Sequence, residues 1–329
     1  MLDKKSILIT GGTGSFGQKF ISEALKKYKK IKRLIIFSRD ELKQSEMEKK
    51  FPKKKYKFLR FFIGDVRDYQ RLYLATKNVD IIIHAAALKQ VPATEYNPFE
   101  CIKTNVLGAQ NIINAAMENK VGKVVALSTD KAVSPINLYG ASKLCADKLF
   151  TSAQNYIGSN KTIFSVARYG NVMNSRGSVI PLFFNQKKNN LFTVTDKDMT
   201  RFNITLKDAT ELVFWTLKNS LGGEIFVPKI PSYRILDLAK AISTDCKIKL
   251  IGIRPGEKIH EELITSNESV NTLDLGKYYV ILPTISRISI DNYKKKQNGK
   301  RLPKNFSYNS GTNPNFLSIT ELKKLLKKM

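Results

Sequence analysis

The chain has 329 residues, 42% of them hydrophobic, and its 56 Lys and Arg against 28 Asp and Glu give a formal net charge of +28. This length predicts about two domains, and no apolar run approaches the ~20 residues that a membrane-spanning helix needs. The first residues run straight into a predicted strand, so we expect no signal peptide. Three widely spaced cysteines without metal-ligand spacing indicate a cytoplasmic protein with reduced thiols and no metal site.

The positive charge has two interpretations. It could serve nucleic-acid binding or attachment to an anionic membrane, or it could be a Lys-rich background spread over solvated faces. The Lys runs are scattered along the chain, and none is interleaved with aromatic residues or belongs to a DNA-reading motif. We therefore expect neither nucleic acid nor a membrane as a partner.

A glycine-rich turn follows the first predicted strand, at residues 6–10, and leads directly into a helix with apolar residues at helical spacing. This context favours a dinucleotide site over a ligand-free tight turn. Glycines allow the backbone to approach a pyrophosphate, whose charge is held by helix N-terminal amides. The residues expected to contact the cofactor here are Gly11, Thr13, Gly14, Ser15, Phe16 and Gly17.

The end of the second predicted strand, at residues 33–37, bears on the choice between NAD and NADP. NAD sites usually place an acidic residue at this position, whereas an Arg accommodates the 2′-phosphate of NADP. Arg39, with Ser38 and Lys43, favours NADP, although Asp40 is adjacent.

Two further strands, predicted at 58–63 and 79–84, also end in residues that suit a cofactor. An aspartate after the first could reach the adenine amine, and small residues after the second let the backbone pass close to the ligand. His84 is interpreted as a packed residue. The expected contacts are Asp65, Val66, Ala85, Ala86 and Ala87.

The apolar run 124–127 predicts a strand buried on both faces, with polar residues at its carboxyl end, where open α/β sheets bind ligands. A helix that begins near Asn137 would place Tyr139 and Lys143 on one face. We expect the Lys143 ammonium to lower the pKa of the phenol from its usual ~10, so that the pair moves a proton. Counted along the chain this is the fifth strand–helix unit, so the pair should face the cofactor cleft.

These patterns predict an α/β fold: a doubly wound parallel Rossmann sheet with a smaller C-terminal substrate domain. After a strand at 162–166 the regular alternation of strands and helices is expected to stop. We predict a cofactor domain at 1–167 with a returning strand near 224–228, and an interleaved sugar-nucleotide domain at 168–284. Residues 285–329 should form an exposed basic arm and a short helix capped by Ser318 and Glu321.

The chain resembles the extended short-chain dehydrogenases/reductases, and among them the inverting UDP-N-acetylglucosamine 4,6-dehydratases that open pseudaminic acid synthesis. The resemblance runs from residue 7 to about 284. It rests on the motifs ITGGTGSFG, FSRDELKQSEM, GDVRD, HAAALKQVP, STDKA, PINLYGASKL, RYGNV, SRGSV, MTRF, GGEIFVPKIP and IGIRPGEK. A related group of capsule-pathway dehydratases lacks the active-site Tyr that is present here as Tyr139.

The resemblance implies a homo-oligomeric NADP enzyme with a defined set of site residues. Its catalytic set falls on Thr129, Asp130, Lys131, Tyr139 and Lys143, of which Tyr139 and Lys143 are also expected to contact the cofactor. Its UDP-sugar contacts fall on Lys89, Thr129, Asn171, Arg201, Arg254 and Glu257.

The implied reaction is an internal redox cycle at sugar carbons C4, C5 and C6. Tyr139 takes the C4 hydroxyl proton, Lys131 takes the C5 proton, and Asp130 protonates the C6 hydroxyl, which leaves as water. A base at position 131 must be neutral, which costs roughly 4–5 kcal/mol at pH 7, so its pKa is expected to be lowered by burial near Lys143 and the nicotinamide. Two alternatives stay open: a 4-epimerase of the same fold, and a non-catalytic NADP-binding or nucleic-acid-binding protein.

Overall fold

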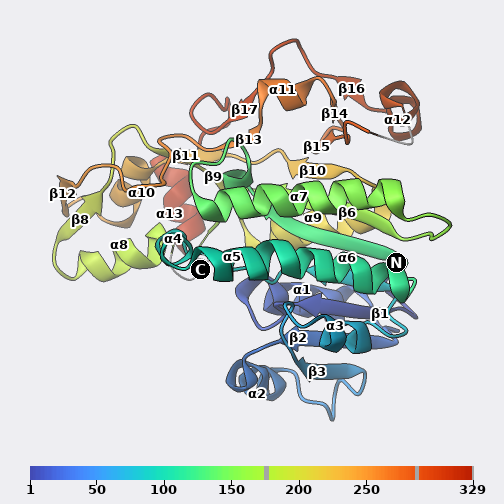
Figure 1. Ribbon diagram of the computed structural model, residues 1–329. Helices are drawn as coiled ribbons and strands as arrows, with labels where there is room; N and C mark the ends of the chain where they lie inside the picture. Colours follow the sequence, from blue (N-terminus) through green and yellow to red (C-terminus); the bar gives the residue numbers. More distant parts are fainter. Residues whose placement is uncertain (174–177, 286–288, 328–329) are drawn as a thin grey trace.

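Short runs of β-branched and aromatic residues form the parallel part of a ten-stranded sheet, whose strands lie one above another in Figure 1, from β3 at the bottom upward. The computed structural model describes residues 1–173, 178–285 and 289–327. In order across the sheet the parallel strands are β3 (Leu59–Ile63), β2 (Arg33–Ser38), β1 (Ser6–Thr10), β4 (Ile81–His84), β5 (Lys123–Thr129), β6 (Ile163–Tyr169) and β10 (Ile225–Pro228). This order confirms the doubly wound α/β fold, with its switch point between β1 and β4.

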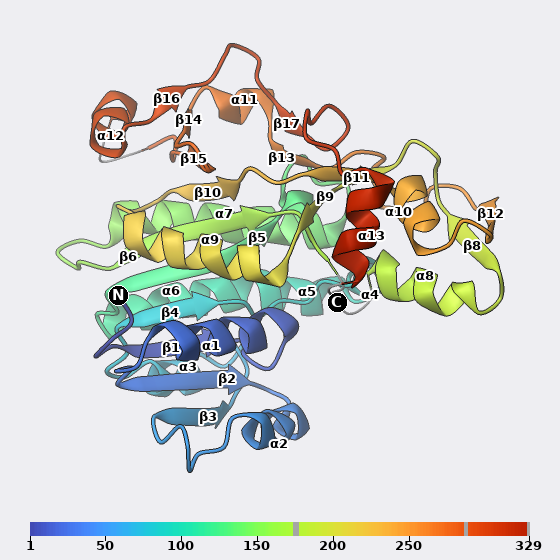
Figure 2. The ribbon, with the colours of Figure 1, turned by 180° about the vertical axis from the view of Figure 1, so that it is seen from behind.

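Helices cover both faces of the sheet. One face carries α1 and α9, which lie in front in Figure 2 and whose Phe20 and Phe214 rings are 4.9 Å apart between centroids. The other face carries α3, α6 and α7, in front in Figure 1. The helices along the sheet are α1 (Ser15–Lys27), α2 (Glu41–Lys50), α3 (Tyr69–Ala75), α4 (Val91–Tyr96), α5 (Pro98–Ile102), α6 (Gly108–Glu118), α7 (Leu138–Tyr156) and α9 (Leu206–Asn219).

The regular alternation of strands and helices stops after β6, as expected, because residues 171–173 and 178–204 form short strands and a helix that are not part of the ten-stranded sheet. After β6 the chain still forms α9 and β10, and β10 pairs parallel to β6 where the returning strand was expected. Helix α9 buries an apolar face on the sheet and β10 extends it, so the chain returns to the parallel sheet after this interruption, as predicted.

The last part of the chain is not an exposed arm. The sheet continues antiparallel through β15 (Tyr278–Ile281), β14 (Thr272–Asp274) and the short β16 (Lys300–Arg301). Between them α12 (Ile290–Gln297) buries Tyr293, whose hydroxyl donates to Glu224 Oε1 at 3.1 Å. A buried aromatic side chain thus helps to hold this Lys-rich segment against the sheet. Because such a contact leaves no periodic apolar pattern in the sequence, the segment was expected to be an exposed arm.

A smaller lobe with its own apolar core lies beyond the carboxyl ends of the parallel strands (Figure 1). It contains α8 (Val179–Lys187), β8 (Leu191–Val194), α10 (Ile235–Ile242), β12 (Lys247–Leu250) and α13 (Ile319–Lys327). Ser318 and Glu321 form the predicted cap of α13, with Ser318 N donating to the Glu321 carboxylate at 2.8 Å.

Short strands join the lobe to the sheet. They are β7 (Asn171–Val172), β9 (Thr200–Ile204) and β11 (Ser232–Arg234) in one small sheet, and β13 (Glu262–Ile264) paired with β17 (Tyr308–Asn309), with α11 (Ser266–Ser269) after β13. The boundaries 1–167, 168–284 and 285–329 stay a prediction. Within the described ranges, no helix is both long enough and apolar enough to cross a membrane.

Candidate active site

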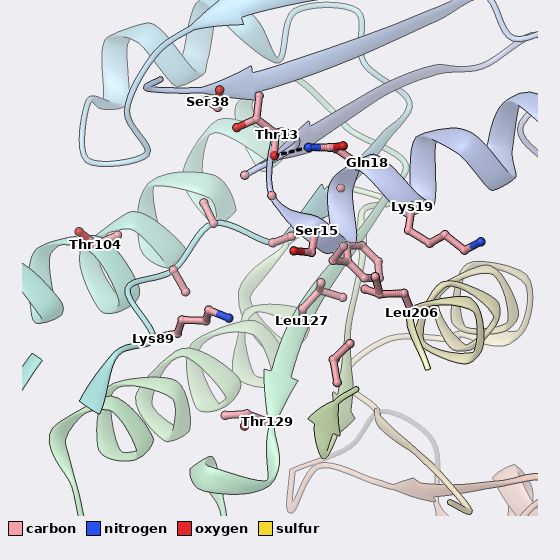
Figure 3. Close-up of a pocket in the computed structure, with 18 of the residues that line it drawn as sticks. Thr13, Ser15, Gln18, Lys19, Ser38, Lys89, Thr104, Leu127, Thr129 and Leu206 are labelled. Atoms are coloured by element: carbon pink, nitrogen blue, oxygen red, sulfur yellow. Dashed lines mark hydrogen bonds between the residues drawn. The ribbon is translucent and has the colours of Figure 1, made fainter. Parts of the chain in front are cut away.

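A cavity of about 1060 Å³ opens along the carboxyl ends of β1, β2, β4 and β5 and reaches β7. Figure 3 shows that side chains from the glycine turn, from the ends of β2 and β5, and from the loop after β4 surround this cavity. The volume is at the upper end of the range for small-molecule sites, which suits a ligand as long as a dinucleotide with space left for a second molecule.

The glycine turn at one end of the cavity fits a pyrophosphate. Gly11 has φ +63°, and a Cβ on it would stand 2.9 Å from Ala86 N, while a Cβ on Gly17 would collide with the Gly12 carbonyl. Helix α1 begins after Gly14 without a side-chain cap, so its first amides stay open to an anion. Gln18 instead steadies the turn by donating to Thr13 O at 3.0 Å (Figure 3). The predicted residues Gly11, Thr13, Gly14, Ser15, Phe16 and Gly17 all line the cavity.

At the end of β2, Arg39 lies next to Asp40, whose carboxylate is already paired with a lysine. Asp40 caps α2 by accepting from Lys43 N at 2.9 Å, and it pairs with Lys43 Nζ at 2.6 Å. Arg39 is half-exposed, and its guanidinium lies 3.5 Å from Asp65. Ser38 Oγ accepts from Gln44 Nε2 at 3.0 Å. Because Lys43 occupies the Asp40 carboxylate, Arg39 is the group best placed to meet a 2′-phosphate.

Asp65, expected to reach the adenine amine, is also paired with a cation. Its carboxylate accepts from Arg67 Nε at 2.9 Å and lies 2.7 Å from the second guanidinium nitrogen. Burial raises the pKa of Asp65, but Arg67 outweighs burial and the net pKa is lowered. Asp65 and Val66 line the cavity together with Ser38, Arg39, Asp40 and Lys43.

Hydrogen bonds to β1 and to the π-helical turn 103–107 hold the loop after β4 in place. Ala85 N and Ala86 N donate to Thr10 Oγ1 at 3.1 and 3.2 Å. Asn105, in the π-helical turn 103–107, closes two hydrogen bonds with the Leu88 backbone at 2.8 and 2.9 Å. Ala85, Ala86 and Ala87 therefore stay close to the ligand space that they line.

His84 is packed, as predicted. It is 1% exposed and shares a 2.9 Å hydrogen bond between its Nδ1 and Thr10 Oγ1. Burial, together with the nearby Lys143, lowers the pKa of His84 to about 3. The ring is therefore neutral at any physiological pH and supports the loop rather than the chemistry.

Helix α7 positions Tyr139 and Lys143 on the cavity wall. It begins as predicted, because the Asn137 side chain accepts from Gly140 N at 2.7 Å. Lys143 is 5% exposed and donates from Nζ to Leu127 O at 2.7 Å. Burial lowers the pKa of Lys143.

The pKa of Tyr139 differs from the expectation. Burial raises it to about 12, against the opposing charge of Lys131 and a hydrogen bond with Thr129. The predicted lowering by Lys143 was wrong, because the Lys143 ammonium is directed at a backbone carbonyl. A further positive charge in the cavity would be needed to favour the phenolate.

The side chain of Lys131 lies between two buried carboxylates. Its Nζ is 3.1 Å from Asp130 Oδ1 and 3.0 Å from Glu261 Oε1. Burial lowers the pKa of Lys131, but the two carboxylates outweigh burial and raise it above the usual value. The expected lowering was therefore wrong, because the sequence analysis did not include Glu261.

Asp130 is fully buried, and its pKa is raised, first by burial and further by Glu261, despite the opposing effect of Lys131. Its Oδ2 has no hydrogen-bond partner in the described structure. A carboxyl group in this environment holds its proton more strongly than a free aspartate does.

The predicted sugar-nucleotide contacts separate into two groups. Lys89, Thr129 and Asn171 line the cavity, whereas Arg201, Arg254 and Glu257 do not. Arg254 and Glu257 form an ion pair with each other, with Arg254 mostly exposed. Part of the SRGSV motif, residues 174–177, lies outside the described residues.

The loop that carries Arg254 lies at the start of α7. Asn137 Nδ2 donates to Gly256 O at 2.8 Å, which ties this loop to the helix that carries Tyr139. Arg201 is buried and donates to Thr200 O at 2.7 Å and to Ile259 O at 3.1 Å. Its Nε lies 3.8 Å from Glu261, so it faces the carboxylate behind Lys131.

Several cavity-lining residues were not among the predicted site residues. They are Gln18, Lys19, Ser22, Phe37, Lys50, Gly64, Gln90, Thr104, Leu127, Ser128, Tyr169, Gly170, Val172, Ser178 and Leu206. Glu261 was missed as well, although it lies only a few residues after the IGIRPGEK motif. Its position near that motif was the only signal, since no spacing rule connects it to Asp130.

Comparison with known proteins places these residues in a family context. Residues 7–283 match the family described as polysaccharide biosynthesis protein. The chain is 50% identical over 333 residues to a UDP-N-acetylglucosamine 4,6-dehydratase (inverting) of Campylobacter jejuni serotype O:2, covering 99% of this chain and 98% of that one. It is 46% identical over 339 residues to a UDP-glucose 4-epimerase of Rickettsia bellii, covering 99% and 96%. The solved structure of Pen from Bacillus thuringiensis superposes with a TM-score of 0.89 at 41% identity, covering 100% and 99%.

Proposed function

The chain belongs to the polysaccharide biosynthesis protein family of extended short-chain dehydrogenases/reductases, and from this premise we propose that it is a UDP-N-acetylglucosamine 4,6-dehydratase. The product would be UDP-2-acetamido-2,6-dideoxy-β-L-arabino-hexos-4-ulose, formed with inversion at C5 as the first step of pseudaminic acid synthesis. The observation that carries this proposal is the Asp130–Lys131 pair, which lines the same cavity as Tyr139 and Lys143.

We propose NADP as the cofactor, held between the glycine turn and the ends of β2, β3 and β4. A bound nicotinamide would accept a hydride from the sugar and later return it, so no reductant is consumed. The preference for NADP over NAD rests on Arg39, because the neighbouring Asp40 carboxylate is already paired with Lys43.

Tyr139 is assigned the proton of the C4 hydroxyl. Its high pKa favours the protonated phenol, and a positive charge placed next to it, such as an oxidised nicotinamide would supply, would favour the phenolate. Lys143 is buried one helical turn further along α7. Its hydrogen bond to Leu127 O fixes the helix against β5 at this end of the cavity.

Loss of water from C6 needs an acid, and Asp130 suits that role. Burial and Glu261 raise its pKa, and its Oδ2 has no other partner in the described structure. A carboxyl group whose pKa is raised holds its proton to higher pH than a free aspartate does, so that it can donate this proton to the departing hydroxyl.

Lys131 is assigned the C5 proton. Because two carboxylates favour its ammonium form, Lys131 must release a proton to solvent before it can accept the one from C5. Asp130 and Glu261 are the two carboxylates within ion-pairing distance, at 3.1 and 3.0 Å. Reprotonation at C5 from the opposite face would then invert that carbon.

A 4-epimerase is the second candidate, and relatives with that name at 46% identity favour it. An epimerase would use Tyr139 and Lys143 but has no elimination step for Asp130 and Lys131 to serve. A non-catalytic NADP-binding protein would have no use for Asp130 and Lys131. A homo-oligomeric assembly and a cytoplasmic location stay predictions.

Mass spectrometry of UDP-N-acetylglucosamine incubated with the protein and no reductant separates these candidates. A dehydratase yields a sugar nucleotide lighter by one water, an epimerase yields an isomer of the same mass, and a binding protein leaves the substrate unchanged. An isomer of unchanged mass would overturn the dehydratase proposal.

A further inference from the structure

Glu261 reaches the site from a part of the chain far from Asp130 and Lys131. It immediately precedes β13, and its backbone is fixed by the C-terminal segment: Glu261 N donates to Ser310 Oγ, and Ser310 N donates to Glu261 O, both at 2.8 Å. Ser310 Oγ is itself hydrogen-bonded to Thr200 Oγ1 at 2.8 Å. The Glu261 carboxylate is thereby held beneath the cavity without lining it.

The charged groups around Glu261 come from three segments. Lys131 Nζ is 3.0 Å away, with Asp130 on its far side, and Arg201 Nε of β9 is 3.8 Å away. Lys258, from its own loop, contributes a weaker positive charge while donating to Val133 O at 2.5 Å. The neighbouring His260 ring faces Thr200 Oγ1 instead, at 2.9 Å. Glu261 is 2% exposed, and its Oε2 has no hydrogen-bond partner in the described residues.

We propose that Glu261 is a positioning residue of the dehydratase site, whose negative charge holds Lys131 against Asp130 and sets the pH range in which both groups work. The inference rests on the proposed function. Glu261 does not touch the space where the sugar would bind, so it acts only through Lys131 and through its field at Asp130.

The order of charges gives the physical reason. The arrangement Asp130, Lys131, Glu261, Arg201 alternates acid and base, so one ammonium is shared by two carboxylates in a buried site. Burial raises the pKa of Glu261, but Lys131 and Arg201 outweigh burial and keep it ionised. The pKa of Asp130 is raised instead. Glu261 thus favours its carboxylate form, whereas Asp130 holds a proton more strongly than a free aspartate does.

The test replaces Glu261 with Gln, which keeps the shape and removes the charge. A negative charge raises the pKa of every acid near it, whether ammonium or carboxyl. Glu261→Gln should therefore move both limbs of the pH profile of kcat/KM for dehydration to lower pH by about 1–3 units, the usual effect of one close charge. A merely structural loss would lower activity at every pH and leave the limbs in place.

Two further variants act as controls. Glu261→Asp keeps the charge and should restore the wild-type limbs even if its activity is lower. Glu262→Gln removes the next carboxylate along the chain, which accepts from Ser134 Oγ at 3.4 Å and does not contact Lys131, so it should leave the profile unchanged.

A second readout does not depend on turnover. The neutral fraction of Lys131 can be followed by its rate of acylation with acetic anhydride, quantified by peptide mass spectrometry across pH. At pH values below the pKa of Lys131, Glu261→Gln should raise the acylation rate about 10- to 1000-fold. This increase corresponds to the same lowering of the Lys131 pKa by about 1–3 units. Unchanged acylation and unchanged limbs in Glu261→Gln would overturn the inference. If the wild-type protein forms no dehydrated product, the proposed function fails, and the acylation rates still decide whether Glu261 controls Lys131.

Discussion

Removing the Lys131 side chain should separate the two proton transfers of the proposed reaction. Lys131→Ala leaves Tyr139, Lys143 and the glycine turn intact, so oxidation at C4 should continue. Elimination should slow by about 10²–10⁴-fold, the usual contribution of a positioned base, which is about 3–5 kcal/mol of barrier. Reduced nicotinamide should then accumulate on the enzyme beside a 4-keto sugar that still carries its C6 hydroxyl.

The structure also predicts a cost in stability for this change. The ammonium lies 3.1 Å from Asp130 and 3.0 Å from Glu261, and its loss leaves both carboxylates buried without it. Leaving one buried charge uncompensated typically costs about 3–5 kcal/mol, although uptake of a proton by Asp130 relieves part of that cost. The Lys131→Ala protein should therefore be least stable at high pH and recover as the pH falls. Circular dichroism and cofactor binding check that it remains folded.

Stopped-flow absorbance of reduced nicotinamide is the assay, with Tyr139→Phe as the matched comparison. Tyr139→Phe removes the group assigned to the C4 hydroxyl, so oxidation itself should be slow and no reduced cofactor should build up. Normal turnover by Lys131→Ala would refute the assignment of the C5 proton to Lys131. Accumulation in both variants would refute the separation of the two roles.

Three further predictions concern the cofactor, pH stability and charge. NADP+ should bind more tightly than NAD+, and Arg39→Ala should narrow the difference by about 1–3 kcal/mol in calorimetric titrations; equal affinities of the wild-type protein would contradict this. Because burial lowers the pKa of His84 to about 3 while the unfolded chain binds that proton near pH 6.5, stability should fall as the pH drops below 6.5. Between pH 7 and 4.5 this group should remove about 3 kcal/mol from the free energy of unfolding, and His84→Gln should show a smaller loss in urea titrations; an equal loss in both proteins would exclude His84 as its source. Binding to arbitrary duplex DNA should be weak and disappear at moderate salt in filter-binding assays, whereas sequence-selective binding at physiological salt would revive the nucleic-acid interpretation.

Local patterns were sufficient to predict the parts of the site that a single strand–helix unit builds. The glycine turn is recognisable because strand, turn and helix follow one another directly. The start of α7 is recognisable because Asn137 is a strong N-cap residue and lies a few residues before Tyr139 and Lys143. In each case the residues that cooperate are neighbours in the sequence, so their spacing carries the information.

Contacts between distant segments were not predictable in this way. Glu261 reaches Lys131 across 130 positions of sequence, through a loop anchored by Ser310, and no periodic pattern connects them. The pKa of Lys131 was consequently expected to fall, whereas the second carboxylate raises it. The segment after residue 284 was misjudged for a similar reason, since Tyr293 anchors it through one long-range hydrogen bond to Glu224.

The central claim, that this protein dehydrates a UDP-sugar with inversion at C5, is tested most directly by a proton NMR spectrum of UDP-N-acetylglucosamine incubated with the enzyme in D₂O without added reductant. The account predicts a 4-keto product with a C6 methyl group, deuterium at C5, and coupling constants of the L-arabino configuration. A product that keeps its C6 hydroxyl and differs only at C4 would contradict the account and identify an epimerase.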